Sequence, residues 1–315
     1  MIYLRISNGL GNQMFQYAFG RQIQEIYHMP LVLETFRYHD FVETLRPLGT
    51  EKKRHFLLNR LSIPFENASE GGNGCIVANG LQSIIVTGHS FVKRFWAEKI
   101  KKIPQTGADG YSRMIKRGMY ATNDIVSYYP FERTNAKNIV LHGWFMSEKY
   151  FHDIAPTIKQ ELRVKEVSSD AVRRLAAQML QENSVCVHVR RGDYIGHSRF
   201  DVCTVDYFRR AVEYVRERVA HPVFYVFSNN PAELDWIKEH YAFLEGAHFV
   251  KEGVDELDDL YLMYHCRHHI ISNSTFSWWG SYLKLQEGMT ICPERWLNDD
   301  MQQDILLEDW IPLPV

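Results

Sequence analysis

The stretch Val185-Cys-Val-His-Val-Arg-Arg-Gly-Asp-Tyr194 decides the fold of this chain. Residues 185–189 are rich in valine and predict a short strand that is buried on both faces. The loop that follows holds two arginines, a glycine and an aspartate. In parallel α/β sheets, ligands bind beyond the carboxyl ends of the strands, so we expect this loop to carry functional groups.

The second half of the chain continues this pattern, because strand-like and helical segments alternate with short loops between them. Such alternation predicts a parallel sheet that is covered by helices on both faces. The further strands are predicted at residues 223–227, 248–250, 269–271 and 289–292, and the helices at 204–220, 232–240, 257–267 and 275–285.

The first half opens as strand, loop, helix and strand. We predict a strand at 2–6, a glycine-rich turn at 7–13, a helix at 14–27 and strands at 31–33 and 139–141. A length of 315 residues suits two domains, and the most plausible boundary lies between residues 161 and 170. Together the two halves predict an α/β protein.

Composition narrows the class of function. With 36 Lys or Arg and 38 Asp or Glu, the net charge is −2, which argues against a nucleic-acid partner. The five cysteines form no C-x-x-C pair, so we expect buried free thiols in a reducing compartment. Because neither a signal segment nor a run of about 18 apolar residues occurs, we expect a cytoplasmic protein.

The loop after residue 189 is the first candidate site. His188 and Arg190 are two residues apart and therefore share a face of the strand near its end. A guanidinium in this place can clamp an oxyanion with two parallel hydrogen bonds. The alternative interpretation of R-R-G-D is a structural pair between arginine and aspartate.

Two further loops follow predicted strands. Ser228-Asn-Asn-Pro231 either caps the next helix or contacts a ligand. Ser272-Asn-Ser-Thr-Phe-Ser-Trp-Trp-Gly280 brings hydroxyl groups and free backbone N–H groups to the start of a helix, a combination that binds phosphate. Several hydroxyl groups in one short segment are more than capping requires.

The N-terminal turn, Asn8-Gly-Leu-Gly-Asn-Gln13, does not match G-x-G-x-x-G because Met14 stands in the third glycine position. Its glycines would allow a ligand to approach the backbone, and Asn12 and Gln13 suit a sugar hydroxyl. No P-loop, G-x-S-x-G, H-E-x-x-H or D-x-D motif occurs. A bound diphosphate would therefore depend on Arg190 and on Ser274 with Thr275.

Three segments together resemble the bacterial α1,2-fucosyltransferases of glycosyltransferase family 11. They are Gly9-Leu-Gly-Asn-Gln-Met-Phe-Gln-Tyr-Ala18, His188-Val-Arg-Arg-Gly-Asp-Tyr194 and Ser272-Asn-Ser-Thr-Phe-Ser-Trp-Trp-Gly280. Leu141-His-Gly-Trp-Phe-Met-Ser-Glu-Lys-Tyr-Phe151 and Phe227-Ser-Asn-Asn230 also resemble family segments. The matches run from residue 9 to residue 280, but residues 38–130 match no motif.

The resemblance implies a GT-B fold, with two Rossmann-like domains whose parallel sheets face each other across a cleft. Residues 1–165 would mainly bind the acceptor, and residues 166–315 would bind GDP-fucose. The implied reaction is an inverting, metal-independent transfer of L-fucose to the 2-hydroxyl of a terminal galactose, in an oligosaccharide or a lipid-linked glycan.

The resemblance also implies roles for single residues. Arg190 would stabilise the leaving diphosphate, and Asp259 would read guanine, although Asp258 is adjacent and the alignment could slip. Gly11, Asn12 and Gln13 would lie near the transferred sugar and the acceptor. The full nucleotide site expected from these matches comprises His188, Arg190, Ser228, Asn229, Asp259, Ser274, Thr275 and Phe276.

Asp193 is the nearest carboxylate in a matching motif, so it is either the base for the acceptor hydroxyl or a structural partner of Arg191. Two positions depart from the family pattern. Asn8 stands where glycine is frequent, which a turn with positive φ tolerates. Asn229 and Asn230 stand where acidic residues are frequent, which argues against a charged role for that loop.

Residues 89–117 hold eight Lys or Arg against two acidic residues. A helix at 91–103 could rest on anionic lipid, which suits a lipid-linked acceptor, or it could be an ordinary solvated helix on the core. Two other functions remain open. One is a sugar-nucleotide transferase with another donor or acceptor, and the other is a non-catalytic glycan-binding protein, which would account for the 13% aromatic residues.

Overall fold

A computed structural model describes residues 1–35, 55–64, 114–122, 125–299 and 303–315. The chain divides into two compact units. Unit 1 comprises Met1–Asn59 and Ile63–Ile158, and unit 2 comprises Arg60–Ser62 and Lys159–Val315. The main division therefore falls at residue 158, within α5 (Ala155–Glu161).

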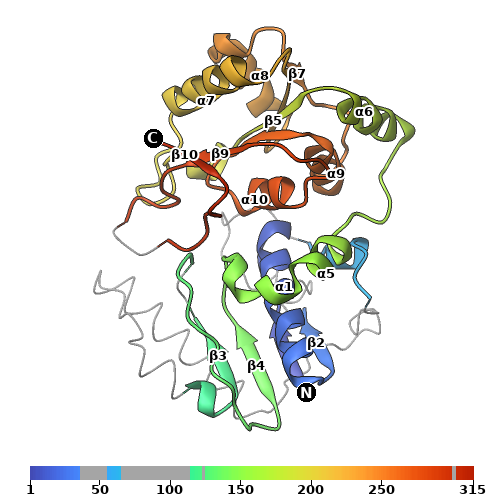
Figure 1. The fold of residues 1–315 in the computed structure, drawn as a ribbon, viewed down its shortest axis with the longest axis vertical. Coiled ribbons are helices and arrows are strands. Elements are labelled where there is room, and N and C mark those ends of the chain that lie inside the picture. Colours follow the sequence, from blue (N-terminus) through green and yellow to red (C-terminus); the bar gives the residue numbers. More distant parts are fainter. Residues whose placement is uncertain (36–54, 65–113, 123–124, 300–302) are drawn as a thin grey trace, which may run out of the picture. The chain divides into compact units, whose positions relative to one another are not determined.

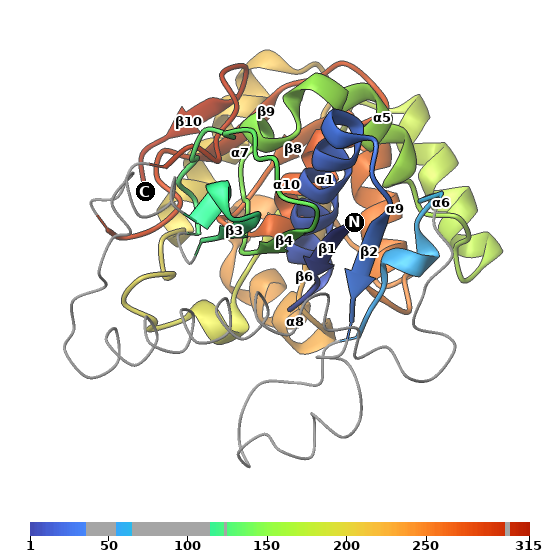
Figure 2. The ribbon, with the colours of Figure 1, turned by 90° about the horizontal axis from the view of Figure 1, so that it is seen from below.

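The described part of unit 1 contains a parallel sheet in the order β2-β1-β4-β3. Helix α1 (Leu10–Tyr27) packs against β1 and β2 (Figure 2). Because all pairs are parallel, the loops after β1 and β4 leave from the same edge of the sheet. The strands are β1 (Ile2–Arg5), β2 (Leu31–Glu34), β3 (Met119–Ala121) and β4 (Ile139–His142).

The described part of unit 2 contains a parallel sheet in the order β7-β6-β5-β8-β9-β10. From β5 the chain first builds outward through β6 and β7, then returns to β8 on the other side. The strand order therefore reverses between β5 and β8, as in a Rossmann-type sheet. The strands are β5 (Ser184–Val189), β6 (Val223–Ser228), β7 (His248–Phe249), β8 (His268–Ile270), β9 (Thr290–Pro293) and β10 (Ile311–Leu313).

Helices cover both faces of this sheet (Figure 1). Val185, Val187 and Val189 face α7 and α8, whereas Cys186 faces α6 and α9. The alternation of side chains along a strand explains why β5 is apolar throughout. The helices are α6 (Asp170–Gln181), α7 (Val205–Arg218), α8 (Pro231–His240), α9 (Glu256–His265) and α10 (Thr275–Tyr282).

These two units confirm the predicted α/β fold with two Rossmann-like parallel sheets, the architecture of the GT-B type. That the sheets face each other across a cleft stays a prediction. The expected free thiols are confirmed for four cysteines. No helix within the described ranges is long and apolar enough to cross a membrane.

The bounds of two predicted helices need correction. Helix α1 begins at Leu10 and not at residue 14, because Asn8 makes the turn alone with φ 68° and Gly9 already serves as N-cap. Helix α10 ends at Tyr282, earlier than predicted. Helix α6, like α5, β3 and β10, is not among the predicted elements, although Ser169 caps α6 and its buried residues repeat at helical spacing. The predicted basic helix at 91–103 lies outside the described residues.

Candidate active site

Three loops meet at the carboxyl edge of unit 2. They follow β5, β6 and β8, which are neighbours in the sheet, and β5 and β6 pair in register up to Val189 and Ser228. The strand order reverses between β5 and β8, and ligands of open α/β sheets bind at such a point. The structure therefore brings together most of the residues that we predicted for a nucleotide site.

His188 lies at the end of β5, and its side chain reaches across to the loop after β8. Its Nδ1 is 3.1 Å from Oγ of Ser272. Burial, together with the nearby charge of Arg190, lowers the pKa of His188 to about 3. The imidazole is therefore neutral near pH 7, so it donates a hydrogen bond through one nitrogen and accepts through the other.

Arg190 is held by two neighbours, but part of its guanidinium remains unsatisfied. Its Nη1 donates to Oδ1 of Asn229 at 3.2 Å, and its Nη2 donates to Oδ1 of Asp193 at 2.7 Å. The Nε is buried and has no hydrogen-bond partner within the described residues. A buried N–H without a partner is costly, so this atom marks a place where an anion would be stabilised.

Arg191 points to a different partner from the one we predicted. Its Nε donates to Oε2 of Glu233 at 2.8 Å, and its guanidinium lies 3.2 Å from the ring centre of Trp236. Asp193 pairs with Arg190 and not with Arg191, so the suggested Arg191–Asp193 pair is wrong. Arg191 instead fixes the start of the loop to α8.

Three residues at the end of β6 and in the loop after it form hydrogen bonds with different partners. The Ser228 hydroxyl donates to the carbonyl of Val189 at 2.8 Å, and Asn229 holds Arg190. Asn230 caps α8, since its side chain accepts from the N–H of Glu233 at 3.1 Å. Capping is thus confirmed for Asn230, and Asn229 acts on the neighbouring loop.

Helix α10 starts at the carboxyl edge of β8 without a side-chain cap. Ser274 occupies the N-cap position, but its side chain makes no capping hydrogen bond. By contrast, α6, α7, α8 and α9 each have a side-chain cap. Thr275 and Phe276 form the first turn of α10, and the Phe276 ring lies 5.8 Å from that of His188. A helix start of this kind favours a negatively charged group.

The two adjacent acids of α9 differ sharply. Asp258 accepts from the backbone N–H groups of Ser168 and Val254 at 2.9 and 3.0 Å, and from the Ser168 hydroxyl. Although burial acts in the opposite direction, these hydrogen bonds lower the pKa of Asp258. Burial, followed by the charges of Asp258, Asp255 and Glu256, raises the pKa of Asp259 to about 7.

The three residues predicted for the sugar and the acceptor lie in unit 1, in the first turns of α1. Gly11 and Gln13 are buried and Asn12 is half-buried. The Gln13 carboxamide donates to the carbonyls of Asn8 and His55 at 2.8 and 2.7 Å, and accepts from the N–H of Leu57 at 3.0 Å. Gln13 therefore holds residues 55–57 against the N-terminal turn.

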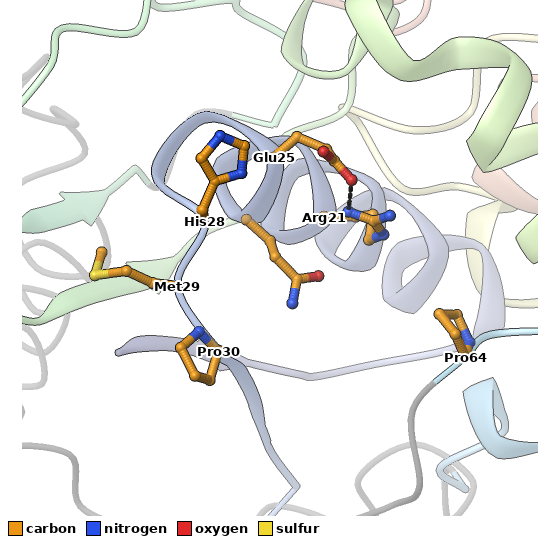
Figure 3. A pocket seen from close by; sticks show the side chains of 7 residues that line it. Arg21, Glu25, His28, Met29, Pro30 and Pro64 are labelled. Atoms are coloured by element: carbon orange, nitrogen blue, oxygen red, sulfur yellow. Dashed lines mark hydrogen bonds and ion pairs between the residues drawn. The ribbon is translucent and has the colours of Figure 1, made fainter.

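Unit 1 also contains a cavity of about 460 Å³ that the sequence did not indicate (Figure 3). It lies where α1 ends and β2 begins, at the amino edge of the sheet, and Arg21 and Glu25 form an ion pair beside it. It does not contain any of the predicted site residues. Its lining comprises Arg21, Gln24, Glu25, His28, Met29, Pro30 and Pro64.

Comparison with known proteins adds a family to this geometry. The family described as Glycosyl transferase family 11 matches residues 116–313, which is more than half of the chain. The chain belongs to glycosyl transferase family 11. This membership confirms the resemblance found in the sequence and makes the chain a glycosyltransferase.

Relatives of this family 11 chain act with different sugars. It is 29% identical to an α-1,2-colitosyltransferase from Escherichia coli over 95% of this chain and 93% of that one. It is 28% identical to the human galactoside α-(1,2)-fucosyltransferase 1 over 48% of this chain and 49% of the human one. Its structure resembles that of the NodZ α-1,6-fucosyltransferase soaked with GDP-fucose with a TM-score of 0.45, at 14% identity over 90% and 92% of the chains.

The chemistry available to this family 11 chain is the binding of an anion at the carboxyl edge of unit 2. One permanent positive charge and an open helix start lie on the two sides of the β5–β8 reversal. Among the described residues, no group of three or more His, Cys, Asp or Glu side chains is placed to hold a metal ion. Sequence reasoning missed Glu233 and Trp236 because their roles depend on contacts between distant segments.

Proposed function

We propose that this chain transfers L-fucose from GDP-fucose to the 2-hydroxyl of a terminal galactose, with inversion and without a metal ion. The observation that carries this proposal is the buried Nε of Arg190, which has no hydrogen-bond partner among the described residues and lies at the strand-order reversal of a family 11 glycosyltransferase. Cleavage of the fucose–phosphate bond builds negative charge on the departing diphosphate. A fixed guanidinium at that position lowers the barrier.

The diphosphate would lie between the loops after β5 and β8. Arg190 supplies the charge and Nε–H, and Ser274 with Thr275 lies at the start of α10, where Ser274 makes no side-chain capping hydrogen bond. The neutral ring of His188 and the side chain of Phe276 would line the nucleotide beside it. Ser228 and Asn229 act mainly by holding the loop after β5 in place.

Asp259 would read guanine through its carboxylate. Guanine offers two N–H donors to an acceptor, and only the ionised form of Asp259 accepts both. Because the pKa of Asp259 is about 7, a proton would leave the protein when guanine binds at lower pH. The carboxylate of Asp258 already accepts hydrogen bonds from the N–H groups of Ser168 and Val254, which favours Asp259 for this role.

The acceptor would contact unit 1 through Gly11 and Asn12. We assign Gln13 a supporting role, since its carboxamide is engaged with backbone groups on both sides. Asp193 would chiefly orient Arg190, because it accepts from the guanidinium at 2.7 Å. Its service as base for the acceptor hydroxyl requires it to release that bond, and an Asp193→Asn variant separates the two roles.

A second candidate donor is GDP-colitose. The colitosyltransferase from Escherichia coli matches nearly the whole of this chain, whereas the human fucosyltransferase matches about half. The same anion site would serve either donor, because in both cases GDP is the leaving group and the sugar separates from it as a glycosyl cation. The choice would depend on contacts to the sugar ring.

The experiment combines nucleotide binding with product analysis. We expect GDP to raise the melting temperature, UDP and ADP to raise it less, and EDTA to leave the GDP shift unchanged. GDP-fucose and GDP-colitose are then offered with a panel of galactosides, and the linkage and anomeric configuration of each product are determined. Preference for UDP would contradict the GDP site, and exclusive use of GDP-colitose would replace the donor.

A further inference from the structure

One buried side chain joins three loops at the carboxyl edge of unit 2. Asn273 follows β8 and is only 2% exposed. Its Nδ2 donates to the carbonyl of Phe200 at 2.9 Å and to the carbonyl of Trp296 at 3.0 Å. Phe200 lies in the loop after β5, and Trp296 lies in the segment after β9. The carboxamide of Asn273 is thus a link between the loops of three strands.

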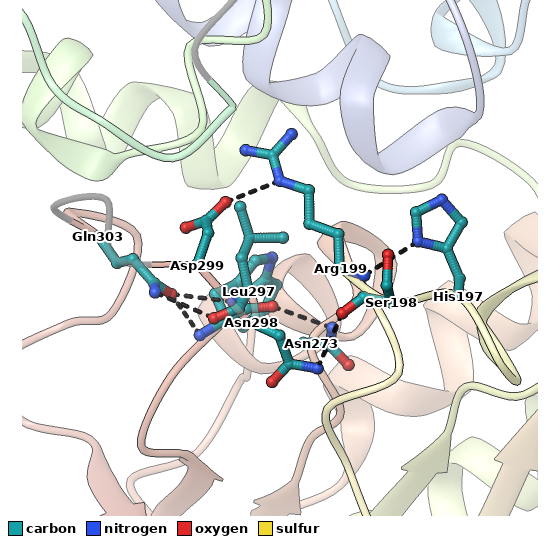
Figure 4. Close-up of polar contacts among 9 residues, drawn as sticks. His197, Ser198, Arg199, Asn273, Leu297, Asn298, Asp299 and Gln303 are labelled. Carbon is teal, nitrogen blue, oxygen red and sulfur yellow. Dashed lines mark hydrogen bonds and ion pairs between the residues drawn. The ribbon is translucent and has the colours of Figure 1, made fainter. Parts of the chain in front are cut away.

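Asn298 and Asp299, in the same segment after β9, form further contacts with the loop after β5 (Figure 4). These contacts make up the exposed rim of the link. Asn298 donates from Nδ2 to the carbonyls of Ser198 and Asp201, at 3.4 and 2.9 Å. Arg199 and Asp299 form an ion pair at 2.7 Å, with about a quarter of each side chain exposed. These contacts also hold residues 198–201.

The inner side of the same loop leads back to Arg190. The Phe200 ring stacks on the Tyr194 ring at 5.3 Å with an angle of 27°. The Arg190 guanidinium in turn lies 5.0 Å from the centre of the Tyr194 ring. A displacement of Phe200 would therefore move the aromatic surface on which Arg190 rests, and a cation above an aromatic face is attracted to it.

We propose that Asn273 is a positioning residue for Arg190, acting through Phe200 and Tyr194. The proposal rests on the function proposed above, in which Arg190 binds the diphosphate of the donor. Asparagine suits this task because its amide group donates two hydrogen bonds to two carbonyls at once. Aspartate has the same shape but offers only acceptors, so it would repel both carbonyls and release the loop.

Two variants test the link. Asn273→Asp removes both donors at the centre, and Asn298→Ala removes two donors at the exposed rim, where the change disturbs folding less. Asn183→Ala is the matched control. Asn183 also donates from Nδ2 to a distant carbonyl, that of Ala220 at 2.7 Å, but it precedes β5 at the opposite edge of the sheet.

Hydrogen exchange measures the first step of the proposal without any reference to catalysis. The N–H groups of Phe200 and Asp201 both donate to the carbonyl of His197, so they are protected while the loop is closed. We expect these amides to exchange about tenfold faster in Asn273→Asp and Asn298→Ala, and at the wild-type rate in Asn183→Ala. Unchanged exchange in both loop variants would overturn the proposal.

GDP affinity and steady-state kinetics measure the second step. We expect kcat to fall about 10²-fold in Asn273→Asp, with a smaller fall in Asn298→Ala, while the KM for the acceptor changes little. Phe200→Leu should lower kcat much less when it is added to Asn273→Asp than when it is made in the wild type, because both substitutions act on one chain of contacts.

The outcomes separate this proposal from the function on which it rests. Faster exchange with wild-type GDP affinity and kcat would overturn the positioning role and leave the proposed function standing. A wild-type chain that binds neither GDP nor GDP-fucose would overturn both. If Asn273→Asp does not fold, Asn298→Ala takes its place in both measurements, and unchanged exchange or unchanged kcat in that variant would overturn the proposal.

Discussion

In each unit the first strand of the sheet lies between the second strand and a later one, but the two units use this reversal of strand order in opposite ways. In unit 1, Gln16 fills the space between the loops after β1 and β4: it accepts from the Ser7 N–H at 2.9 Å and donates to the Gly143 carbonyl at 3.0 Å. In unit 2, the corresponding loops after β5 and β8 are joined by the His188–Ser272 contact and, further along both loops, by the hydrogen bond from Asn273 to Phe200, and Arg190 keeps a buried Nε without a partner among the described residues.

This difference shows that a parallel α/β sheet supplies a place for a ligand without deciding whether one binds there. The neutral carboxamide of Gln16, which bonds both Ser7 and Gly143, makes the reversal in unit 1 a structural joint. A permanent charge with an unsatisfied donor makes the reversal in unit 2 a site that is completed by an anion. Four changes test this contrast.

The largest effect is expected at the charged reversal. Arg190→Ala should lower kcat about 10³-fold, since one donor aimed at developing charge typically contributes 10²–10³ and Arg190 also supplies the charge. The melting temperature should change little, because the variant also removes a buried unsatisfied N–H. Steady-state kinetics with GDP-fucose checks this, and retention of most activity would remove Arg190 from the mechanism.

Asp259→Asn should stabilise the protein in a pH-dependent way. The pKa of Asp259 is raised to about 7, so its contribution to stability is fully present below about pH 4 and is lost as the pH rises to 7. The variant should therefore gain on the order of 3 to 4 kcal/mol over the wild type at pH 8 and very little at pH 4. Denaturant unfolding at the two pH values measures this.

The same variant should lose its preference for GDP over ADP if Asp259 reads guanine. Asp235→Asn is a suitable control, because Asp235 forms an exposed ion pair with Lys251 in the same unit. A gain in stability with an unchanged GDP preference would transfer the reading of guanine to another residue.

A substitution at the strand-order reversal of unit 1 should lower the stability of the protein without changing its affinity for GDP. Gln16→Ala leaves the Ser7 N–H and the Gly143 carbonyl without their partner, and should cost about 3 kcal/mol. Gln24→Ala on the same helix is the control, since Gln24 lines the surface cavity. Urea unfolding and GDP titration check this, and a weaker affinity for GDP at unchanged stability would break the contrast between the units.

The smallest effect concerns acid stability. The pKa values of His188 and His269 are lowered to about 3, mainly by burial, so each contributes stability above pH 6.5 that is lost as the pH falls toward 3. At pH 5 each histidine should lower the free energy of unfolding by about 2 kcal/mol relative to neutral pH. The opposite effect of Asp259 offsets part of this loss. His188→Gln should remove about half of the loss, and an unchanged acid limb of the stability curve would contradict this.

Much of the fold could be predicted because local patterns agree with the final environment. The strand at 185–189 and the helix at 204–220 match the observed elements within a few residues. The start of α1 differs from the prediction because Gly9 and Gly11 are typical of a turn, whereas Asn8 alone reverses the chain. Helix α6 lies next to the segment in which the sequence predicts only a domain boundary.

The candidate site was predictable in its charged residues and unpredictable in their partners. Arg190 and Ser274 stand out in the sequence because they follow strands. The pairing of Asp193 with Arg190, and of Arg191 with Glu233, depends on side-chain directions that spacing does not reveal. Residues 42 positions apart in the chain meet only because β5 and β6 are neighbours.

The sequence by itself determined the α/β class, the strands of both sheets that carry the candidate residues, and the chemical types at the strand ends. These follow from hydrophobic periodicity and residue chemistry, which are local properties. Only the tertiary structure decided that the side chains of Gln13 and Gln16 form hydrogen bonds with backbone groups. It also decided that Asp259, rather than Asp258, has a pKa of about 7, and that the Nε of Arg190 has no hydrogen-bond partner among the described residues. Hydrogen-bond satisfaction and desolvation are properties of the packed surroundings, and they exist only after distant segments have come together.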